Sequence, residues 1–291
     1  MTAPGHPLPT PTAEGPLLLW LLGVLKPMNR TRVKQLLKNG GVSVNGAFVT
    51  RHDHPVKPGD RVTVSKAGPP PETTILERAG ITVVYQDAAL IVINKPCGLL
   101  TVATDAEKHV TAFAVLSAHL EETDAGRPYV VHRLDRDTSG LLMFARTEEV
   151  QETLQEDWDT VTKTYVAVTE GTPTPAEGVI DTHVEPTRDL RMRVCPEGEG
   201  TKRAVTAYKV VRTYERHAML EVELRTGRKH QIRVHLAKRG WPVVGDQAYG
   251  AKTNPANRLG LHAWKLAFAH PVTGERVELE QPIPHELNRI V

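Results

Sequence analysis

The sequence predicts an α+β protein with a small amino-terminal domain and a larger second domain, and three observations support this prediction. The chain of 291 residues is long enough to bury the cores of one large and one small domain. Three consecutive prolines at residues 69–71 divide a short basic part from a longer one. In the longer part, strand-like segments do not alternate regularly with helical ones, which favours α+β over a wound α/β sheet.

Composition is typical of a soluble globular protein. Hydrophobic residues make up 40% of the sequence and charged residues 24%. Cys97 and Cys195 are far apart and form no C-x-x-C pair, which argues against a disulfide framework or a zinc site and favours a reducing compartment. The longest apolar run, Leu17–Leu25, is too short to span a bilayer. A cytoplasmic location is therefore expected.

Four ranges are predicted along the chain. Residues 1–16 are rich in proline and poor in hydrophobic side chains, so they are expected to be a disordered tail. Residues 17–66 are assigned to the small domain and residues 67–74 to a stiff polyproline linker. Residues 75–291 are assigned to the large domain.

The small domain is predicted to contain two helices followed by a hairpin. Leu17–Leu25 is predicted to be a short buried helix. A second helix is expected to begin after Asn29 as N-cap and to end at Asn39-Gly40-Gly41. The alternation of residues 42–49 around Asn45-Gly46 predicts a hairpin, because a type I′ turn needs positive φ at both central positions.

Positive charge is concentrated in this domain. Residues 28–66 carry eight basic and two acidic residues, a net charge of +6, so the rest of the chain sums to −4. Arg30, Lys34 and Lys38 have i, i+4, i+8 spacing and would form a basic stripe on the second helix. Such a concentration indicates a polyanionic partner, although on charge alone an ordinary solvated face is an equally good interpretation.

The pattern of residues 17–66 resembles the S4 RNA-binding domain. In both, a basic helix is followed by a glycine-led Val-x-Val-Asn-Gly run, here Gly41–Gly46, and by Lys-Pro-Gly-Asp, here Lys57–Asp60. An arbitrary α+β mini-domain would not account for the basic stripe. The resemblance implies that the basic residues of the helix bind RNA, namely Arg30, Arg32, Lys34 and Lys38.

In the large domain, β signals predominate. Strands are predicted at Ile81–Tyr85, Leu90–Asn94, Thr164–Val168, Val205–Val211 and Ala218–Arg225. Helices are predicted around Val110–Leu120 and Glu148–Asp157.

Residues 132–140, His-Arg-Leu-Asp-Arg-Asp-Thr-Ser-Gly, form the segment richest in reactive groups. Apolar stretches flank it on both sides, so it is expected at the edge of a core. A carboxylate there needs either a charged partner or a functional role. A Ca²⁺ loop is excluded because its twelfth position is Arg146, a cation. A Ser–His–Asp triad is disfavoured because no nucleophile turn or oxyanion hole accompanies it.

A third interpretation is that Asp135 acts as a nucleophile or in acid–base catalysis beside arginines. Arg133 and Arg136 are the local candidates for that cation. For residues 137–139, a structural loop with capping side chains is the better interpretation.

Val131–Leu142 resembles the signature of the RluA-type pseudouridine synthases, His-Arg-Leu-Asp-x-x-Thr-Ser-Gly-Leu-Leu. Further motifs of that family match at Asn94–Gly98, Lys163–Ala167, Thr226–His235, Gly245–Gly250 and Leu261–Ala263. The resemblance covers residues 75–291. It implies a mixed, mostly antiparallel central sheet.

The resemblance also implies an isomerase that converts uridine in RNA to pseudouridine. Asp135 falls on the essential aspartate, which either attacks covalently or removes a proton in a glycal route. Tyr165 falls on the tyrosine that packs on the target base, and Arg233 on the basic residue that pairs with the aspartate. Arg133 falls on the arginine that enters the space vacated by the flipped nucleotide.

Physical reasoning agrees with these assignments. A base cannot rotate inside a helix, so the nucleotide is extruded at a cost of a few kcal/mol, which an aromatic platform partly offsets. Arg136, Arg228 and Lys229 are expected to contact RNA. No metal and no cofactor are expected, because the reaction involves no net oxidation or hydrolysis. His230 and His235 are expected to pack or to contact phosphate.

The expected partner is large-subunit ribosomal RNA or its precursor particle, because S4-bearing members of the family commonly act there. Transfer RNA is the alternative substrate. A catalytically silent RNA-binding or ribosome-assembly factor is a different class, against which intact Asp135, Tyr165 and Arg233 argue. An N-glycosidase using Asp135 is disfavoured because no second carboxylate has a clear role as base. The protein is expected to be a monomer without a membrane partner.

Overall fold

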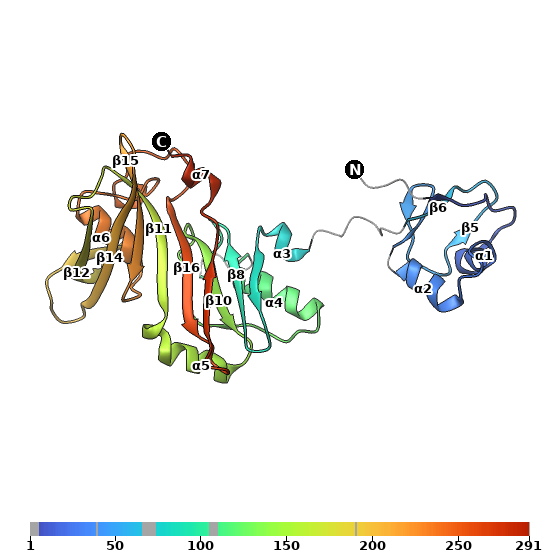
Figure 1. Ribbon diagram of the computed structural model, residues 1–291, viewed down its shortest axis with the longest axis horizontal. Coiled ribbons are helices and arrows are strands. Elements are labelled where there is room, and N and C mark those ends of the chain that lie inside the picture. Colours follow the sequence, from blue (N-terminus) through green and yellow to red (C-terminus); the bar gives the residue numbers. More distant parts are fainter. Residues whose placement is uncertain (1–5, 39, 66–73, 105–109, 190, 291) are drawn as a thin grey trace. The chain divides into compact units, whose positions relative to one another are not determined.

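The structure, a computed structural model, describes residues 6–38, 40–65, 74–104, 110–189 and 191–290 (Figure 1). The chain divides into two compact units, Met1–Thr74 and Ile75–Val291. The predicted linker, apart from residue 74, lies outside the described residues. No helix in the described ranges is long and apolar enough to cross a membrane.

The first unit packs two helices against short strands. Its helices are α1 (Leu17–Val24) and α2 (Arg30–Lys38). A four-stranded antiparallel sheet has the order β1 (His6–Pro7), β6 (Val62–Val64), β3 (Val42–Val44) and β4 (Ala47–Phe48). A separate ladder pairs β2 (Gly15–Pro16) with β5 (Pro55–Val56).

Two local sequence signals in this unit are confirmed. The Asn29 Oδ1 accepts the backbone N–H of Arg32 at 2.9 Å, as an N-cap does. Asn45 and Gly46 both have positive φ, 52° and 86°, at the turn between β3 and β4. The basic helix and the hairpin therefore form where their sequences predict.

The prediction of a disordered tail is wrong for residues 6–16. Strand β1 pairs with β6, and β2 pairs with β5. The Leu8 N–H donates to the carbonyl of Val62 at 2.9 Å, and the Leu8 side chain packs against the core of the unit. Composition suggested disorder because proline is common here, but proline is compatible with short edge strands whose partners lie about fifty residues later.

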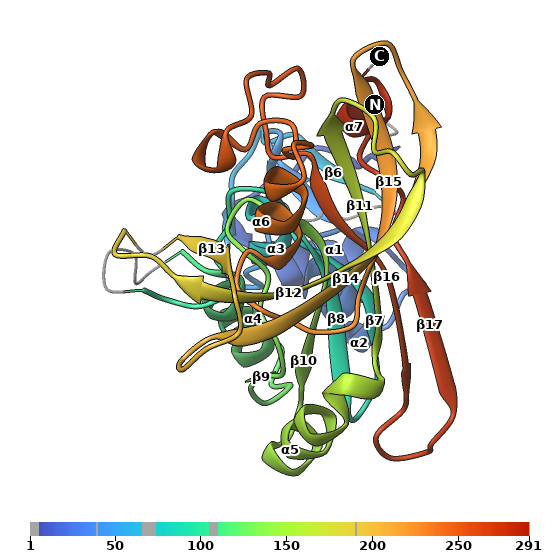
Figure 2. The ribbon, with the colours of Figure 1, turned by 90° about the vertical axis from the view of Figure 1, so that its left-hand side faces the viewer.

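The second unit is built on one eleven-stranded sheet. The main path has the order β13-β12-β14-β15-β11-β16-β10-β8-β7, with β9 beside β10 and β17 beside β16. Every pairing is antiparallel except that of β10 with β16, which confirms the expected mixed, mostly antiparallel sheet. Figure 2 shows its strong twist, since β12 and β14 run nearly across the direction of β8 and β10.

The strands have the following bounds: β7 Thr82–Gln86, β8 Leu90–Lys95, β9 Tyr129–Val130, β10 Ser139–Ala145, β11 Thr162–Glu170, β12 Glu177–Pro186, β13 Met192–Cys195, β14 Lys202–Thr213, β15 His217–Leu224, β16 Leu261–Ala269 and β17 Arg276–Glu280. The helices are α3 Ile75–Arg78, α4 Ala112–Glu122, α5 Glu148–Glu156, α6 Gln231–Lys238 and α7 His285–Asn288. Two 3₁₀ turns, η1 Asp157–Thr160 and η2 Gln247–Tyr249, complete the unit.

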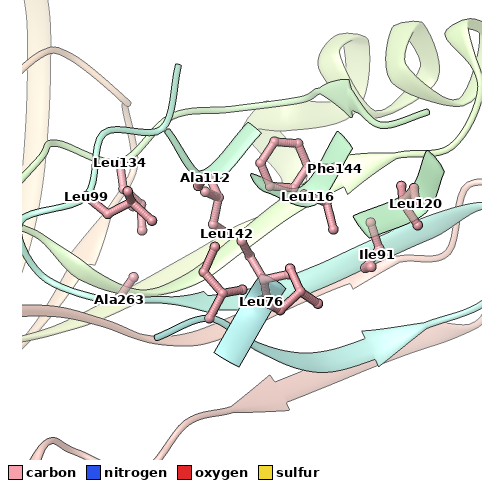
Figure 3. Packing of buried hydrophobic residues seen from close by; sticks show 12 residues of the cluster. Leu76, Ile91, Leu99, Ala112, Leu116, Leu120, Leu134, Leu142, Phe144 and Ala263 are labelled. Carbon is pink, nitrogen blue, oxygen red and sulfur yellow. The ribbon is translucent and has the colours of Figure 1, made fainter. Parts of the chain in front are cut away.

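Two hydrophobic clusters hold the central part of this unit. In the first, α4 packs on β8 and β10, and Figure 3 shows Leu116 and Phe144 in the same layer. This cluster also contains Leu134, which directly precedes Asp135. The second cluster packs α6 on the other end of the sheet and contains Ile232, which directly precedes Arg233. Buried apolar neighbours thus anchor both segments that carry the predicted site.

The parallel pairing of β10 with β16 depends on Gly140. Its φ is +114°, and it lies opposite Ala263 in the ladder. A Cβ at this position would lie 2.2 Å from the Ala263 carbonyl oxygen, which no relaxation of a flexible side chain could relieve. Only glycine therefore allows the two backbones to approach here.

Gly140→Ala is expected to lower the free energy of unfolding of the second unit by about 3 kcal/mol, because it combines backbone strain with a clash against backbone. Chemical denaturation measures the loss. Gly198→Ala is the matched control, since nothing lies within 4 Å of a Cβ added there. Equal stability of the two variants would contradict this explanation of Gly140.

Candidate active site

Three chain segments supply most of the lining of a pocket of about 780 Å³ in the second unit. They are residues 131–138, residues of β11 that include Lys163 and Tyr165, and residues 227–233 at the start of α6. The pocket therefore brings together Asp135, Tyr165 and Arg233, which lie in separate parts of the sequence.

The loop that carries Asp135 leads from β9 into β10 and is held mainly through its backbone. The Leu134 carbonyl accepts the Thr101 hydroxyl at 2.8 Å, and the same hydroxyl oxygen accepts the Leu134 N–H at 3.1 Å. On the other side of Asp135, the Thr138 N–H donates to the Asp135 carbonyl at 3.2 Å and closes a turn. The Thr101 hydroxyl and the turn thus fix the backbone on both sides of Asp135.

Lys95 also holds this loop through hydrogen bonds. Its side chain is fully buried, and its ammonium donates to the carbonyls of Pro96, Leu99 and Arg136 at 2.7–3.0 Å. Burial lowers the pKa of Lys95 to about 8. A buried ammonium that bonds three carbonyls is a structural cross-link between residues 95–99 and the Asp135 loop.

Arg233 links two carboxylates. Its Nε and Nη2 donate to the two carboxylate oxygens of Asp246 at 2.7 and 2.9 Å, and its Nη1 approaches Asp135 Oδ2 at 3.4 Å. Burial opposes the charge of the guanidinium, but hydrogen bonding and attraction from Asp246, then Asp135, raise the pKa of Arg233 overall. The Tyr249 ring lies beneath the guanidinium, with 5.0 Å between the ring centroid and Cζ.

Tyr165 forms an aromatic wall of the pocket. It contacts both hydrophobic clusters, and the register between β11 and β16 shifts between Thr164 and Tyr165. Such an irregularity re-aims a side chain relative to a regular strand. Burial, and then the charge of Asp135, raise the pKa of Tyr165, so the phenol stays neutral at physiological pH.

The rim of the pocket is basic. Among its exposed lining residues, one is acidic, Asp137, and four are basic, namely Arg133, Arg136, Arg228 and Lys229. The cation beside Asp135 is Arg233, as the family resemblance implies. The two local candidates for that cation, Arg133 and Arg136, face solvent instead. In the first unit, the remaining predicted RNA-binding residues are all exposed on α2: Arg30, Arg32, Lys34 and Lys38.

His132 differs from its neighbours in this segment. Its ring stacks on Trp158 with 4.5 Å between centroids, and its Nε2 accepts the N–H of Met143 at 3.0 Å. Burial lowers the pKa of His132 to about 3, so the imidazole is neutral at physiological pH. We therefore assign His132 a structural role in fixing the loop to β10.

Asp246 was not among the residues predicted for the site. It is buried, with 3% of its surface exposed, and it lies in the loop that leads into η2. Its only signal in the sequence was its place in the Gly245–Gly250 motif, which gave no indication that it would meet Arg233. Within the described ranges, no group of three or more His, Cys, Asp or Glu side chains could hold a metal ion.

A carboxylate that meets a buried guanidinium in a pocket with an aromatic wall and a basic rim is the arrangement of an enzyme acting on a nucleotide of a polyanionic chain. Comparison with known proteins specifies the class. The family model described as RNA pseudouridylate synthase matches residues 89–238. The chain belongs to this family, in its RluA-type branch, and is an isomerase.

Curated relatives extend the similarity over most of the chain. An uncharacterised RNA pseudouridine synthase of Bacillus subtilis is 38% identical over 90% of this chain and 88% of the relative. Ribosomal large subunit pseudouridine synthase D of Vibrio cholerae is 34% identical over 89% of this chain and 85% of the relative. The solved structure of human RNA pseudouridylate synthase domain containing 4 has a TM-score of 0.61 and 26% identity, covering 73% of this chain and 91% of that one.

Asp246→Asn is expected to lower the free energy of unfolding of the second unit by about 3 kcal/mol, because it removes one anion from a buried ion pair. Denaturation of the full chain measures the loss. Asp181→Asn is the control, since Asp181 forms a comparable two-bond pair with Arg203 at the surface. That variant should be nearly as stable as the wild type. If both variants were equally stable, burial of the ion pair between Asp246 and Arg233 would not account for its contribution to stability.

Proposed function

We propose that this chain isomerises specific uridines to pseudouridine in large-subunit ribosomal RNA, with Asp135 as the essential carboxylate. The observation that carries the proposal is the meeting of Asp135 with Arg233, at 3.4 Å, inside a pocket with a basic rim. The choice of RNA is supported by relatives named ribosomal large subunit pseudouridine synthase D, in Neisseria meningitidis and Vibrio cholerae.

The reaction rearranges one nucleotide without a second substrate. The N1–C1′ bond breaks, the uracil rotates, and C5 bonds to C1′; C5 loses its proton and N1 gains one, so the atoms balance. Asp135 would either attack C1′ or remove a proton from the sugar to give a glycal. In both routes Arg233 supplies positive charge beside the carboxylate.

The target nucleotide has to leave the RNA helix before its base can rotate. Tyr165 offers the aromatic surface on which an extruded uracil can pack, and a neutral phenol adds no charge against the base. Arg133 would fill the space that the nucleotide leaves. Arg136, Arg228 and Lys229, exposed around the same pocket, would contact phosphates.

The first unit would act as an S4-like RNA-binding module. Support comes from the exposed basic residues of α2 and from the hairpin β3–β4, the two elements whose sequences carry the resemblance to that domain. Phosphate contacts of this kind add affinity without sequence preference and make binding sensitive to salt.

Asp135→Asn should abolish release of tritium from unmodified large-subunit ribosomal RNA labelled at uridine C5, while RNA binding is retained. The amide keeps the size of the side chain but cannot act as a nucleophile or as a base. Assaying bulk transfer RNA in parallel identifies the substrate class. An active variant would overturn the role of Asp135, release from transfer RNA alone would overturn the substrate, and binding without release by the wild type would favour a silent RNA-binding factor.

Replacing Arg30, Lys34 and Lys38 together by Gln should weaken RNA binding and flatten the dependence of log K on log salt by about one unit for each phosphate that α2 no longer binds. Filter binding over a range of salt concentrations measures both effects. Arg51→Gln is the control, because Arg51 already pairs with Asp53 at 2.8 Å. An unchanged slope in the triple variant would refute the assignment of α2 to RNA binding.

A further inference from the structure

His230 occupies an unusual backbone position at the entrance to α6. Its φ of 53° and ψ of 19° place it in the left-handed region, which few residues other than glycine adopt. Its carbonyl accepts the N–H of Val234 at 2.9 Å in the first turn of the helix. Strained residues of this kind persist where surrounding contacts hold them, and they concentrate at functional sites.

Tyr249 holds the imidazole of His230 on one side. The tyrosine hydroxyl lies 2.8 Å from His230 Nδ1, and the two rings meet edge to face with centroids 5.7 Å apart. The hydroxyl oxygen also accepts the N–H of Met192 at 2.9 Å. Because that contact uses the oxygen as acceptor, its own proton is available for Nδ1. With the tyrosine proton donated to Nδ1, a neutral His230 carries its own proton on Nε2.

The other side of the imidazole faces Asp135. The distance from Nε2 to Asp135 Oδ2 is 3.9 Å, and Arg233 Nη1 approaches the same oxygen at 3.4 Å. In the described part of the chain, the contacts of Arg233 and His230 with the carboxylate both go to Oδ2. Two donors, one at the N-cap and one in the first turn of α6, thus point at one oxygen of Asp135, which leaves Oδ1 for another partner.

The charge state of His230 fits a donor role better than the expected phosphate contact. Burial lowers the pKa of His230, although Asp135 acts in the opposite direction; Arg233 and Lys229 lower it and Asp246 raises it. A neutral imidazole is a weak ligand for a phosphate but a competent donor through Nε2–H. Apo distances of this kind commonly shorten when a substrate fills the pocket and excludes water.

We propose that His230 is a positioning residue for Asp135: its Nε2–H, together with Arg233, holds Oδ2 and reserves Oδ1 for the sugar of the target nucleotide. This inference rests on the proposed role of Asp135. It assigns His230 to the reaction step and not to RNA binding. It also gives Tyr249 a purpose, which is to fix the tautomer that places the proton on Nε2.

The test compares His230→Asn with His230→Gln in the full chain. Asparagine tolerates the left-handed region well and keeps a polar group near Nδ1, but its side chain ends short of the Nε2 position. Glutamine can place an amide N–H near that position. His285→Asn, an exposed change on α7, is the matched control. Single-turnover tritium release, RNA affinity and thermal unfolding are measured for each variant, with Asp135→Asn as the inactive reference.

His230→Asn should lower the first-turnover rate by about 10- to 100-fold at saturating RNA, with unchanged affinity and unfolding temperature. His230→Gln should recover a large part of that loss. The inference is overturned if His230→Asn keeps the wild-type rate, if its loss lies in RNA affinity, or if the two variants lose rate equally. Activity in Asp135→Asn would instead show that the proposed function itself fails.

Discussion

The buried guanidinium of Arg233 is the interaction on which the arrangement of the site depends. A cation with 8% of its surface exposed is stable only with anions close by, because an uncompensated buried charge costs several kcal/mol. Asp246 satisfies this need with two short bonds, which leaves one edge of the guanidinium for Asp135. The planar fork of an arginine can serve two carboxylates in this way, whereas the point charge of a lysine could not.

Hydrophobic packing brings the segments that carry Asp135 and Arg233 together. Leu134 fixes the Asp135 loop in the cluster beneath α4, and Ile232 fixes α6 in the neighbouring cluster. Lys95 and Thr101 then bind the loop through its carbonyls, so the position of Asp135 depends little on its own side chain. The parallel junction of β10 with β16, which only Gly140 permits, holds the end of the loop against the sheet. A rigid scaffold of this kind keeps reacting groups in place at little cost when substrate arrives.

Local signals in the sequence were enough for elements whose geometry is set by their own residues. The Asn29 cap and the Asn45-Gly46 turn are examples, since each is a bond or a backbone angle within a few positions. The prediction for residues 6–16 is wrong and Asp246 is missed because their partners are distant in sequence, and no period or spacing encodes a contact of that range. The left-handed backbone of His230 likewise gave no signal, because its cause is tertiary.

The most direct test of the account is a double-mutant cycle between Arg233→Lys and Asp246→Asn, read as the first-turnover rate of tritium release below the unfolding temperature of every variant. If Asp246 acts on Asp135 through Arg233, the double variant should be scarcely slower than the slower single variant, with a coupling free energy of about 1 kcal/mol or more. Effects that add to within about 0.5 kcal/mol would show that the two residues act independently, and would contradict the account.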